Sequence, residues 1–208
     1  MAKGFEVLDA GVLEFPEAVR LQQELVNKVR GGLLRGALVV CSHNPVITLG
    51  SSARKENILV PEQELARRNI RVYPCRRGGD VTYHGPGQLV LYPVINLRHF
   101  RKDLHWFLRS LETWAIEVLA EVRITASTRA GATGVWVREK KIASIGIGVR
   151  DWVTFNGMAL NVEACVQADF SLIRACGLDC SMTSIEQESG NTDLAVLAET
   201  FIRRCPYA

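Results

Sequence analysis

The sequence has no long apolar run, and we expect no leader segment. No stretch approaches the roughly 20 apolar residues that a membrane-spanning helix needs. The first residues, Met1 to Leu8, lack both the apolar core of a secretory signal and the Arg- and Ser-rich character of a transit peptide. We therefore expect a soluble, cytoplasmic protein that binds no membrane.

The sequence also lacks linkers, low-complexity tracts and internal repeats. No Pro-, Gly- or Ser-rich stretch divides its 208 residues, and the composition, 48% hydrophobic and 23% charged, is that of a globular protein. A chain of this length can bury a substantial core within one domain. We predict a single domain over residues 1–208.

Neither the cysteines nor the net charge indicates a specialised binding class. The six cysteines form no C-x-x-C pair, and no histidines cluster beside them. This spacing predicts neither a metal site nor a disulfide framework, so we expect most cysteines to be small buried hydrophobic residues. A net charge of +3 is too small to indicate nucleic-acid binding. The basic pairs at 67–68, 76–77 and 140–141 can still form a patch for an acidic partner, although most surface charge is simply solvated.

Hydrophobic periodicity predicts helices and strands without a regular βαβ alternation. The strongest helix spans Asp103 to Val122, with Asp103 as its N-cap and an apolar stripe whose aromatic residues we interpret as core. Clusters of strands between helices indicate an α+β fold, a mixed β-sheet core with flanking helices. The other predicted helices are Pro16–Val29, Pro61–Arg68 and about Asp193–Arg204, and the predicted strands are Phe5–Leu8, Ala37–Cys41, Val46–Leu49, Ile70–Tyr73, Gln88–Leu97, Gly134–Val137, Ile142–Val149 and Met158–Val162.

The most informative segment, 76–88, reads RRGGDVTYHGPGQ and lies between two predicted strands. Glycine weakens such a region because it loses the most backbone freedom on folding, so its four glycines indicate a specific use. We expect them to let main-chain N–H groups approach a ligand closely. The residue order is not that of a phosphate-binding P-loop. A hairpin that merely turns is the alternative interpretation.

The same segment resembles the signature R-G-G-x-x-T-x-H-G-P-G-Q of the lipoyl(octanoyl) transferase family. The related lipoate–protein ligases carry a serine- and glycine-rich loop instead. The resemblance extends over most of the chain, through the segments 44–50, 133–137, 141–146, 156–162, 175–178 and 182–185.

The resemblance implies the biotin/lipoate protein ligase-like fold and an acyltransferase that needs no cofactor. It implies transfer of an octanoyl group from acyl-carrier protein, through a Cys176 thioester, to the lysine of a lipoyl domain. Such domains belong to 2-oxoacid dehydrogenase complexes and to the glycine cleavage H protein. Cys176 and Lys141 are the implied catalytic residues. The implied substrate-binding residues are Arg77, Gly78, Gly79, Asp80, Val81, Thr82, Tyr83 and His84, faced by Ser144, Ile145, Gly146, Gly157, Met158 and Ala159.

Cysteine and lysine suit this chemistry. The thiolate is the reactive species, and an unassisted thiol is only a few per cent ionised at neutral pH. An ammonium at Lys141 would favour the Cys176 thiolate, and the neutral amine could accept a proton from the attacking nucleophile. On a strand Lys140 and Lys141 point to opposite faces, so only one of them can face the site. Without the resemblance, residue statistics favour a buried structural role for Cys176, as for Cys180, and a solvent-exposed charge for Lys141.

Two positions depart from the family pattern. Asn156 stands in place of a histidine, and Ala175 in place of a proline. Asparagine keeps hydrogen bonding but cannot titrate, so we expect it to orient other groups, unless Asn156 and Gly157 only form a solvent-facing turn. Two other functions stay open, an ATP-dependent lipoate–protein ligase and a non-catalytic module that binds acyl-carrier protein or lipoyl domains.

Overall fold

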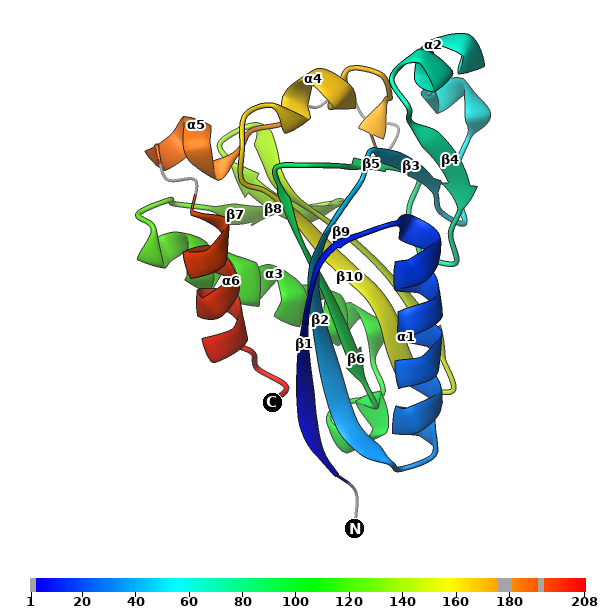
Figure 1. Ribbon diagram of the computed structural model, residues 1–208. Helices are drawn as coiled ribbons and strands as arrows, with labels where there is room; N and C mark the ends of the chain where they lie inside the picture. The colour runs from blue at the N-terminus through cyan, green and yellow to red at the C-terminus, as the bar shows by residue number, and fades with distance from the viewer. Residues whose placement is uncertain (1–2, 176–180, 191–192) are drawn as a thin grey trace.

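Figure 1 shows a computed structural model of the chain, which describes residues 3–175, 181–190 and 193–208. Within these residues the strands form a larger and a smaller sheet. In spatial order, the larger sheet contains β1 (Lys3–Leu13), β2 (Leu34–His43), β6 (Gln88–Ile95), β10 (Val153–Asn161), β9 (Lys140–Arg150), β8 (Ala132–Val137) and β7 (Ser127–Arg129). The smaller sheet contains β4 (Arg71–Pro74), β3 (Val46–Leu49) and β5 (Val81–His84).

Both sheets are mixed. In the larger sheet β1 runs parallel to β2, and the remaining neighbours pair antiparallel. In the smaller sheet β3 runs parallel to β4 and antiparallel to β5. The predicted mixed sheet is therefore confirmed.

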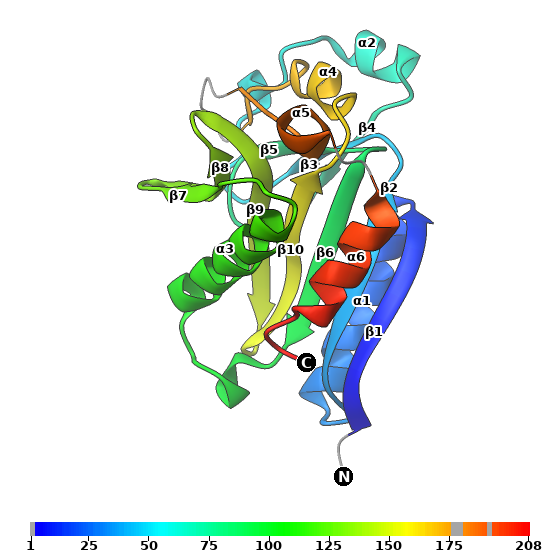
Figure 2. The same cartoon turned by 90° about the vertical axis from the view of Figure 1, so that its left-hand side faces the viewer.

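Helices cover both faces of the larger sheet, as Figure 2 shows. On one face Leu25 belongs to the same buried cluster as Val90 of β6. On the other face the rings of Trp114 and Phe201 meet edge to face, with centroids 5.3 Å apart. The helix on the first face is α1 (Phe15–Arg30), and those on the second are α3 (Leu104–Glu121) and α6 (Leu194–Arg203). Because both faces are covered, every residue of β6 is buried.

The smaller sheet and several short helices gather at one end of the larger sheet (Figure 1). These helices are α2 (Glu62–Arg67), α4 (Val166–Phe170) and α5 (Ile185–Ser189), together with a 3₁₀ turn at Lys55–Asn57. A second 3₁₀ turn, at Leu97–His99, follows β6. A separate buried cluster, which includes Ile47, Tyr83 and Phe170, packs under this end. Within the described residues no helix combines the length and the apolar character that crossing a bilayer requires.

Several sequence predictions are confirmed and others need correction. The carboxylate of Asp103 caps α3 by accepting hydrogen bonds from the main-chain N–H groups of His105 (2.9 Å) and Trp106 (3.1 Å). The elements β5, β7 and α5 were not predicted, because segments of three to five residues are too short for periodicity to show. Strand β10 begins at Val153 rather than Met158. Of the four described cysteines only Cys41 is fully buried, so the expectation of mostly buried cysteines is wrong for these residues.

Candidate functional site

Two adjoining cavities open where the smaller sheet meets β9 and β10. The outer cavity has a volume of about 650 Å³ and is lined by Lys141, and the inner cavity is narrower, about 40 Å³. Except for Tyr83, the predicted binding residues all line one cavity or both. They are Arg77, Gly78, Gly79, Asp80, Val81, Thr82, His84, Ser144, Ile145, Gly146, Gly157, Met158 and Ala159.

Arg77 fixes the glycine-rich segment against β3. Its Nη2 donates hydrogen bonds to the carbonyl oxygen of Thr48 (2.8 Å) and to Thr48 Oγ1 (2.9 Å), and its Nη1 donates to the carbonyl oxygen of Gly78 (3.1 Å). The side chain is only 9% exposed. The guanidinium therefore holds the loop and also places a positive charge in the wall of the inner cavity.

Asp80 connects the glycine-rich segment 76–88 to the loop that follows β3. Its Oδ1 accepts hydrogen bonds from the main-chain N–H groups of Val81 (2.8 Å) and Arg54 (3.0 Å), and its Oδ2 accepts one from Asn57 Nδ2 (2.5 Å). Arg54 and Asn57 line the outer cavity. Asp80 therefore shapes the rim of that cavity by fixing two separate stretches of chain.

From Thr82 to His84, the side chains of β5 alternate between the inner cavity and the core beneath α4. Thr82 and His84 line the inner cavity. The Tyr83 hydroxyl instead donates to Asp169 Oδ2 (2.7 Å), and its ring meets Phe170 edge to face. Tyr83 thus supplies no side chain to either cavity. Within the described part of the chain the buried Thr82 hydroxyl has no hydrogen-bond partner, an arrangement that a bound ligand would satisfy.

The imidazole of His84 is neutral at pH 7. Burial, followed by the nearby His43 and Arg77, lowers its pKa from 6.5 to about 3. Its Nδ1 lies 3.2 Å from Gln88 Oε1. Because a carbonyl oxygen only accepts hydrogen bonds, this contact places the proton on Nδ1 and leaves Nε2 as an acceptor.

A buried chain of amides connects His84 with the segment beyond residue 180. Gln88 Nε2 donates to Asn161 Oδ1 (3.0 Å), and Asn161 Nδ2 donates to the carbonyl oxygen of Thr183 (3.1 Å). These side chains are at most 8% exposed, so each polar group needs its partner. The glycine-rich segment and the C-terminal third of the chain are thereby held in a fixed relation.

The two facing segments predicted from the sequence form one continuous wall. Antiparallel pairing sets Gly146 of β9 opposite Gly157 of β10, and Ser144 opposite Ala159. A Cβ atom on Gly146 would lie 3.0 Å from Arg77 Cδ and 3.1 Å from the carbonyl oxygen of Gly78. Glycine at 146 therefore permits the close approach of the glycine-rich segment to this wall.

Asn156 lies within β10, and the turn between β9 and β10 is made by Asp151 and Trp152 instead. Asn156 is 6% exposed, and its main-chain N–H donates to Gln22 Oε1 (2.6 Å). The interpretation of Asn156 as a solvent-facing turn is therefore wrong. Its φ is 56°, a left-handed value at which asparagine and histidine are both enriched. The backbone at this position accordingly suits either the residue found here or the one that the family usually has.

The two neighbouring lysines have opposite environments. Lys140 is exposed, whereas Lys141 is 1% exposed and lines the outer cavity. Lys141 Nζ donates to the carbonyl oxygen of Thr133 (3.1 Å) and lies 4.9 Å from the ring centroid of Trp136. The alternation expected of a strand is observed, and it directs Lys141 rather than Lys140 to the cavity. The catalytic role of Lys141 stays a prediction.

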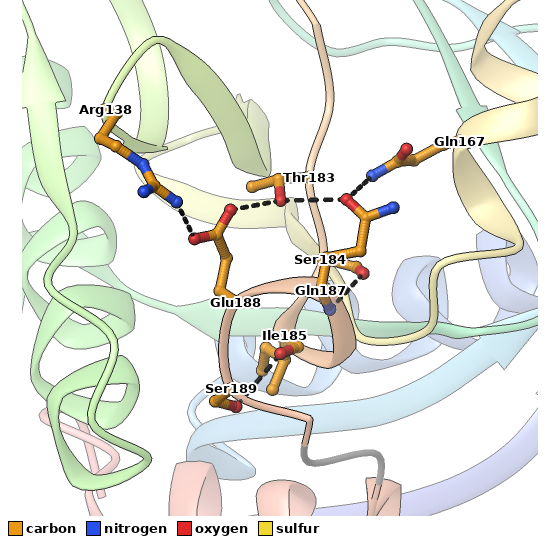
Figure 3. A network of polar contacts seen from close by, with 8 residues as sticks. All are labelled: Arg138, Gln167, Thr183, Ser184, Ile185, Gln187, Glu188 and Ser189. Carbon is orange, nitrogen blue, oxygen red and sulfur yellow. Dashed lines mark hydrogen bonds and ion pairs between the residues drawn. The ribbon is translucent and has the colours of Figure 1, made fainter.

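The segment that follows residue 180 is anchored beside Lys141. The main-chain N–H of Lys141 donates to the carbonyl oxygen of Ser181, and the N–H of Thr183 donates to the carbonyl oxygen of Lys141, both over 2.9 Å. Figure 3 shows the side chains that hold this segment: the Thr183 hydroxyl donates to Glu188 Oε1 (2.7 Å), and Arg138 pairs with Glu188 Oε2. Thr183 is fully buried.

The predicted nucleophile Cys176 lies outside the described residues, as does Cys180. The described residues on both sides of this stretch lie at the outer cavity or next to Lys141, which lines that cavity. Arg174 lines the outer cavity, and Ser181 is bonded to the main chain of Lys141. Ala175 is buried, so the position where the family usually has proline is packed against neighbouring side chains.

Sequence analysis missed three residues that support this region. Thr183 lies in segment 182–185, which carries the family resemblance, but no role was predicted for it. Glu188 had no signal, because α5 is too short for a periodic pattern. Glu112 did have one, because helical spacing places it on the apolar stripe of α3 together with Ala115 and Leu119. Among the described residues no group of three or more His, Cys, Asp or Glu side chains is close enough to hold a metal ion.

Comparison with known proteins identifies relatives over nearly the whole chain. Residues 14–205 match the family described as lipoyl protein ligase A/B catalytic domain. The chain is 46% identical to an octanoyltransferase of Geobacter sp. (strain M21) over 183 residues, which cover 88% of this chain and 85% of that protein. It is 40% identical to an octanoyltransferase of Thermoanaerobacter sp. (strain X514) over 204 residues, which cover 97% and 88%.

Solved structures share the fold at low sequence identity. A bi-partite lipoate protein ligase from Thermoplasma acidophilum matches with a TM-score of 0.75 at 15% identity, over 98% of this chain and 82% of that one. Biotin protein ligase from Aquifex aeolicus matches with a TM-score of 0.53 at 15% identity, over 98% and 68%. The expected biotin/lipoate protein ligase-like fold is confirmed. The chain belongs to the lipoyl protein ligase A/B catalytic domain family, within which it groups with the octanoyltransferases, enzymes that transfer an octanoyl group in protein lipoylation.

Proposed function

We propose that this enzyme takes its octanoyl group from acyl-carrier protein, holds it as a thioester on Cys176 and delivers it to a lysine of a lipoyl domain. The acceptors are lipoyl domains of 2-oxoacid dehydrogenase complexes and the glycine cleavage H protein. The reaction needs no ATP, because a thioester is already activated towards an amine. Its cytoplasmic location stays a prediction.

One observation carries the proposal: the chain on both sides of residues 176–180 is tied to the cavity that Lys141 lines. Arg174 lines that cavity, and the Ser181 carbonyl is 2.9 Å from the Lys141 main-chain nitrogen. Cys176 follows Arg174 by two residues in the sequence, and extended chain spans at most about 3.6 Å per residue. This supports an encounter between the Cys176 thiol and the Lys141 ammonium.

The proposed reaction has two acyl transfers. In the first, the Cys176 thiolate attacks the donor thioester carbonyl, a new C–S bond forms, and the carrier thiolate leaves and takes up a proton. In the second, the acceptor amine attacks the enzyme thioester, the amide forms, and Cys176 leaves as a thiolate. Lys141 stabilises the thiolate as an ammonium and, when neutral, accepts the proton that the amine loses. Main-chain N–H groups of the glycine-bearing segments are the candidate donors to the carbonyl oxygen.

The rim of the outer cavity fits an acidic carrier protein. Arg54 and Arg174 are exposed and line this cavity. Opposite charges across an interface mainly raise the association rate. We therefore expect Arg54→Glu and Arg174→Glu to raise KM for octanoyl-carrier protein by about tenfold, while octanoyl-pantetheine is used as before. Arg20→Glu, at an exposed position on α1, is the matched control.

The decisive experiment is intact-mass measurement after incubation with octanoyl-carrier protein, followed by peptide mapping. We expect one octanoyl adduct on Cys176, its absence in Cys176→Ser, and its loss when a lipoyl domain is added. An adduct on Cys180, or none during turnover, would overturn the assignment. If octanoyl transfer required ATP and free octanoate, the chain would act as a ligase instead.

A further inference from the structure

Glu112 is a fully buried carboxylate on the apolar face of α3. It is 0% exposed, and among the side chains on its stripe are Leu111, Ala115 and Leu119. A buried charge is costly unless it is paired and hydrogen-bonded. Its Oε2 pairs with Arg109 Nη1 at 2.5 Å, and Arg109 is about half exposed. That pair alone does not explain why the carboxylate points inward, since an exposed ion pair would cost less.

The other carboxylate oxygen leads to the candidate active site. Glu112 Oε1 accepts a hydrogen bond from the main-chain N–H of Gly134 (3.0 Å). This N–H belongs to the same peptide group as the carbonyl of Thr133, and that carbonyl accepts the hydrogen bond from Lys141 Nζ (3.1 Å). The carboxylate of Glu112 and the ammonium of Lys141 therefore bind opposite ends of one planar peptide group.

The surroundings of this peptide group leave it little freedom. Gly134 has a φ of 128°, and a Cβ atom there would lie 2.6 Å from the carbonyl oxygen of Ala143 and 3.2 Å from Lys141 Cε. Glycine thus allows β8 and the lysine side chain to approach each other. Trp136 lies two residues after Gly134 in β8, and its ring centroid is 4.9 Å from Lys141 Nζ.

From this geometry we infer that Glu112 is a positioning residue, which aims the Thr133 carbonyl at Lys141 and thereby sets where the ammonium stands in the outer cavity. The hydrogen bond from Gly134 to a charged acceptor is stronger than one to a neutral oxygen, and it orients the peptide. A peptide oriented in this way presents a more negative carbonyl oxygen to the ammonium. The inference rests on the proposed function, in which Lys141 acts on Cys176.

The direction in which the pH midpoint of Cys176 alkylation shifts when Glu112 is replaced separates a positioning role from a simple charge effect. If Glu112 were only a distant negative charge, its removal would favour the Cys176 thiolate and lower the pH midpoint of thiol alkylation. If Glu112 positions Lys141, its removal displaces the ammonium from the thiol, and the midpoint rises. The two explanations thus predict opposite shifts.

The test compares Glu112→Gln, Glu112→Leu, Lys141→Ala and Glu117→Gln with the unaltered enzyme. Glu117 is an exposed carboxylate on the same helix and serves as the matched control. We measure octanoyl transfer from octanoyl-carrier protein, iodoacetamide alkylation of Cys176 against pH, and circular dichroism to verify folding. We expect kcat to fall about 10²-fold in Glu112→Leu, because a misplacement of about 1 Å can cost that much, with KM within twofold. Glu112→Gln keeps an acceptor of the same shape, so we expect a loss of only about tenfold and a smaller rise of the alkylation midpoint.

Wild-type kcat in Glu112→Gln and Glu112→Leu, or a lowered alkylation midpoint, would overturn the inference. If Glu112→Leu does not fold, the isosteric Glu112→Gln decides, and its unchanged kcat or lowered midpoint would overturn the inference alone. If Lys141→Ala itself leaves transfer and alkylation unchanged, the proposed function fails, which is a different result. A defect in Lys141→Ala without one in the Glu112 variants refutes only the role of Glu112.

Discussion

The main-chain N–H of Thr183 donates a hydrogen bond to the main-chain carbonyl of Lys141 over 2.9 Å. In the other direction, the N–H of Lys141 donates to the carbonyl of Ser181, so this short segment forms a parallel bridge with the first residues of β9. The stretch that contains Cys176 is therefore followed directly by residues bonded to the candidate catalytic lysine. This relationship makes the anchoring of residues 181–183 a condition for the proposed chemistry.

Loosening this anchor should slow transfer. In Thr183→Val the hydroxyl that donates to Glu188 Oε1 is lost, and that oxygen of the largely buried carboxylate loses its partner. We expect a loss of about 1–3 kcal/mol in the free energy of unfolding and about tenfold in kcat. Arg138→Gln removes only the ion pair between the exposed Arg138 and Glu188. It should change the free energy of unfolding and kcat little. Urea denaturation and steady-state kinetics measure both effects, and equal losses in the two variants would contradict this account.

The two lysines of β9 should differ sharply. Lys141→Ala should lower both acylation of the enzyme and transfer to the lipoyl domain at least ~10²-fold, because it removes a base and a thiolate-stabilising charge together. Lys141→Met keeps the packing against Trp136 and should show the same loss. Lys140→Ala should behave as the unaltered enzyme, since Lys140 is exposed. Single-turnover kinetics distinguish these outcomes, and similar defects at 140 and 141 would show that the lysine charge acts only from the surface.

Acid should destabilise the protein partly through His84. The pKa of this imidazole is about 3 in the folded chain and 6.5 ordinarily. Between these values the unfolded chain binds a proton that the folded chain does not, so stability is lost as pH falls from 6.5 towards 3. The loss is at most about 1.4 kcal/mol per pH unit. His84→Gln should show a correspondingly smaller fall in the free energy of unfolding between pH 6.5 and 5, as followed by denaturant titration. A variant with the same pH slope as the unaltered protein would exclude this contribution.

Position 156 tests whether the family's histidine is needed for proton transfer. We expect Asn156→His to keep transfer within about tenfold, since both side chains suit a φ of 56° and Lys141 handles the proton. Asn156→Ala should be less stable by about 1–2 kcal/mol, because alanine tolerates left-handed backbone poorly. Asn156→Gly restores the backbone freedom and serves as the matched control. An Asn156→His enzyme faster by orders of magnitude would show instead that a titrating group at 156 completes the mechanism.

Local patterns were sufficient to predict the strongest elements. The apolar stripe and the Asp103 cap of α3 can be read from the chain, because a helix of 18 residues repeats its pattern several times. The alternation that separates Lys140 from Lys141 follows from the two-residue period of a strand. The glycine-rich segment indicated close backbone approach, and a Cβ atom on Gly146 would lie only 3.1 Å from the carbonyl oxygen of Gly78 in that segment.

What the sequence determined by itself is therefore the α+β class, the longer elements and the family, each carried by repeated local patterns or a dense motif. Tertiary structure alone decided that Tyr83 points away from the cavities, that Asn156 lies within a strand, and that Glu112 and Lys141 meet at one peptide group. These relations depend on the register of non-adjacent segments and on which buried polar groups find partners. No local period encodes them, because each partner is contributed by a distant part of the chain.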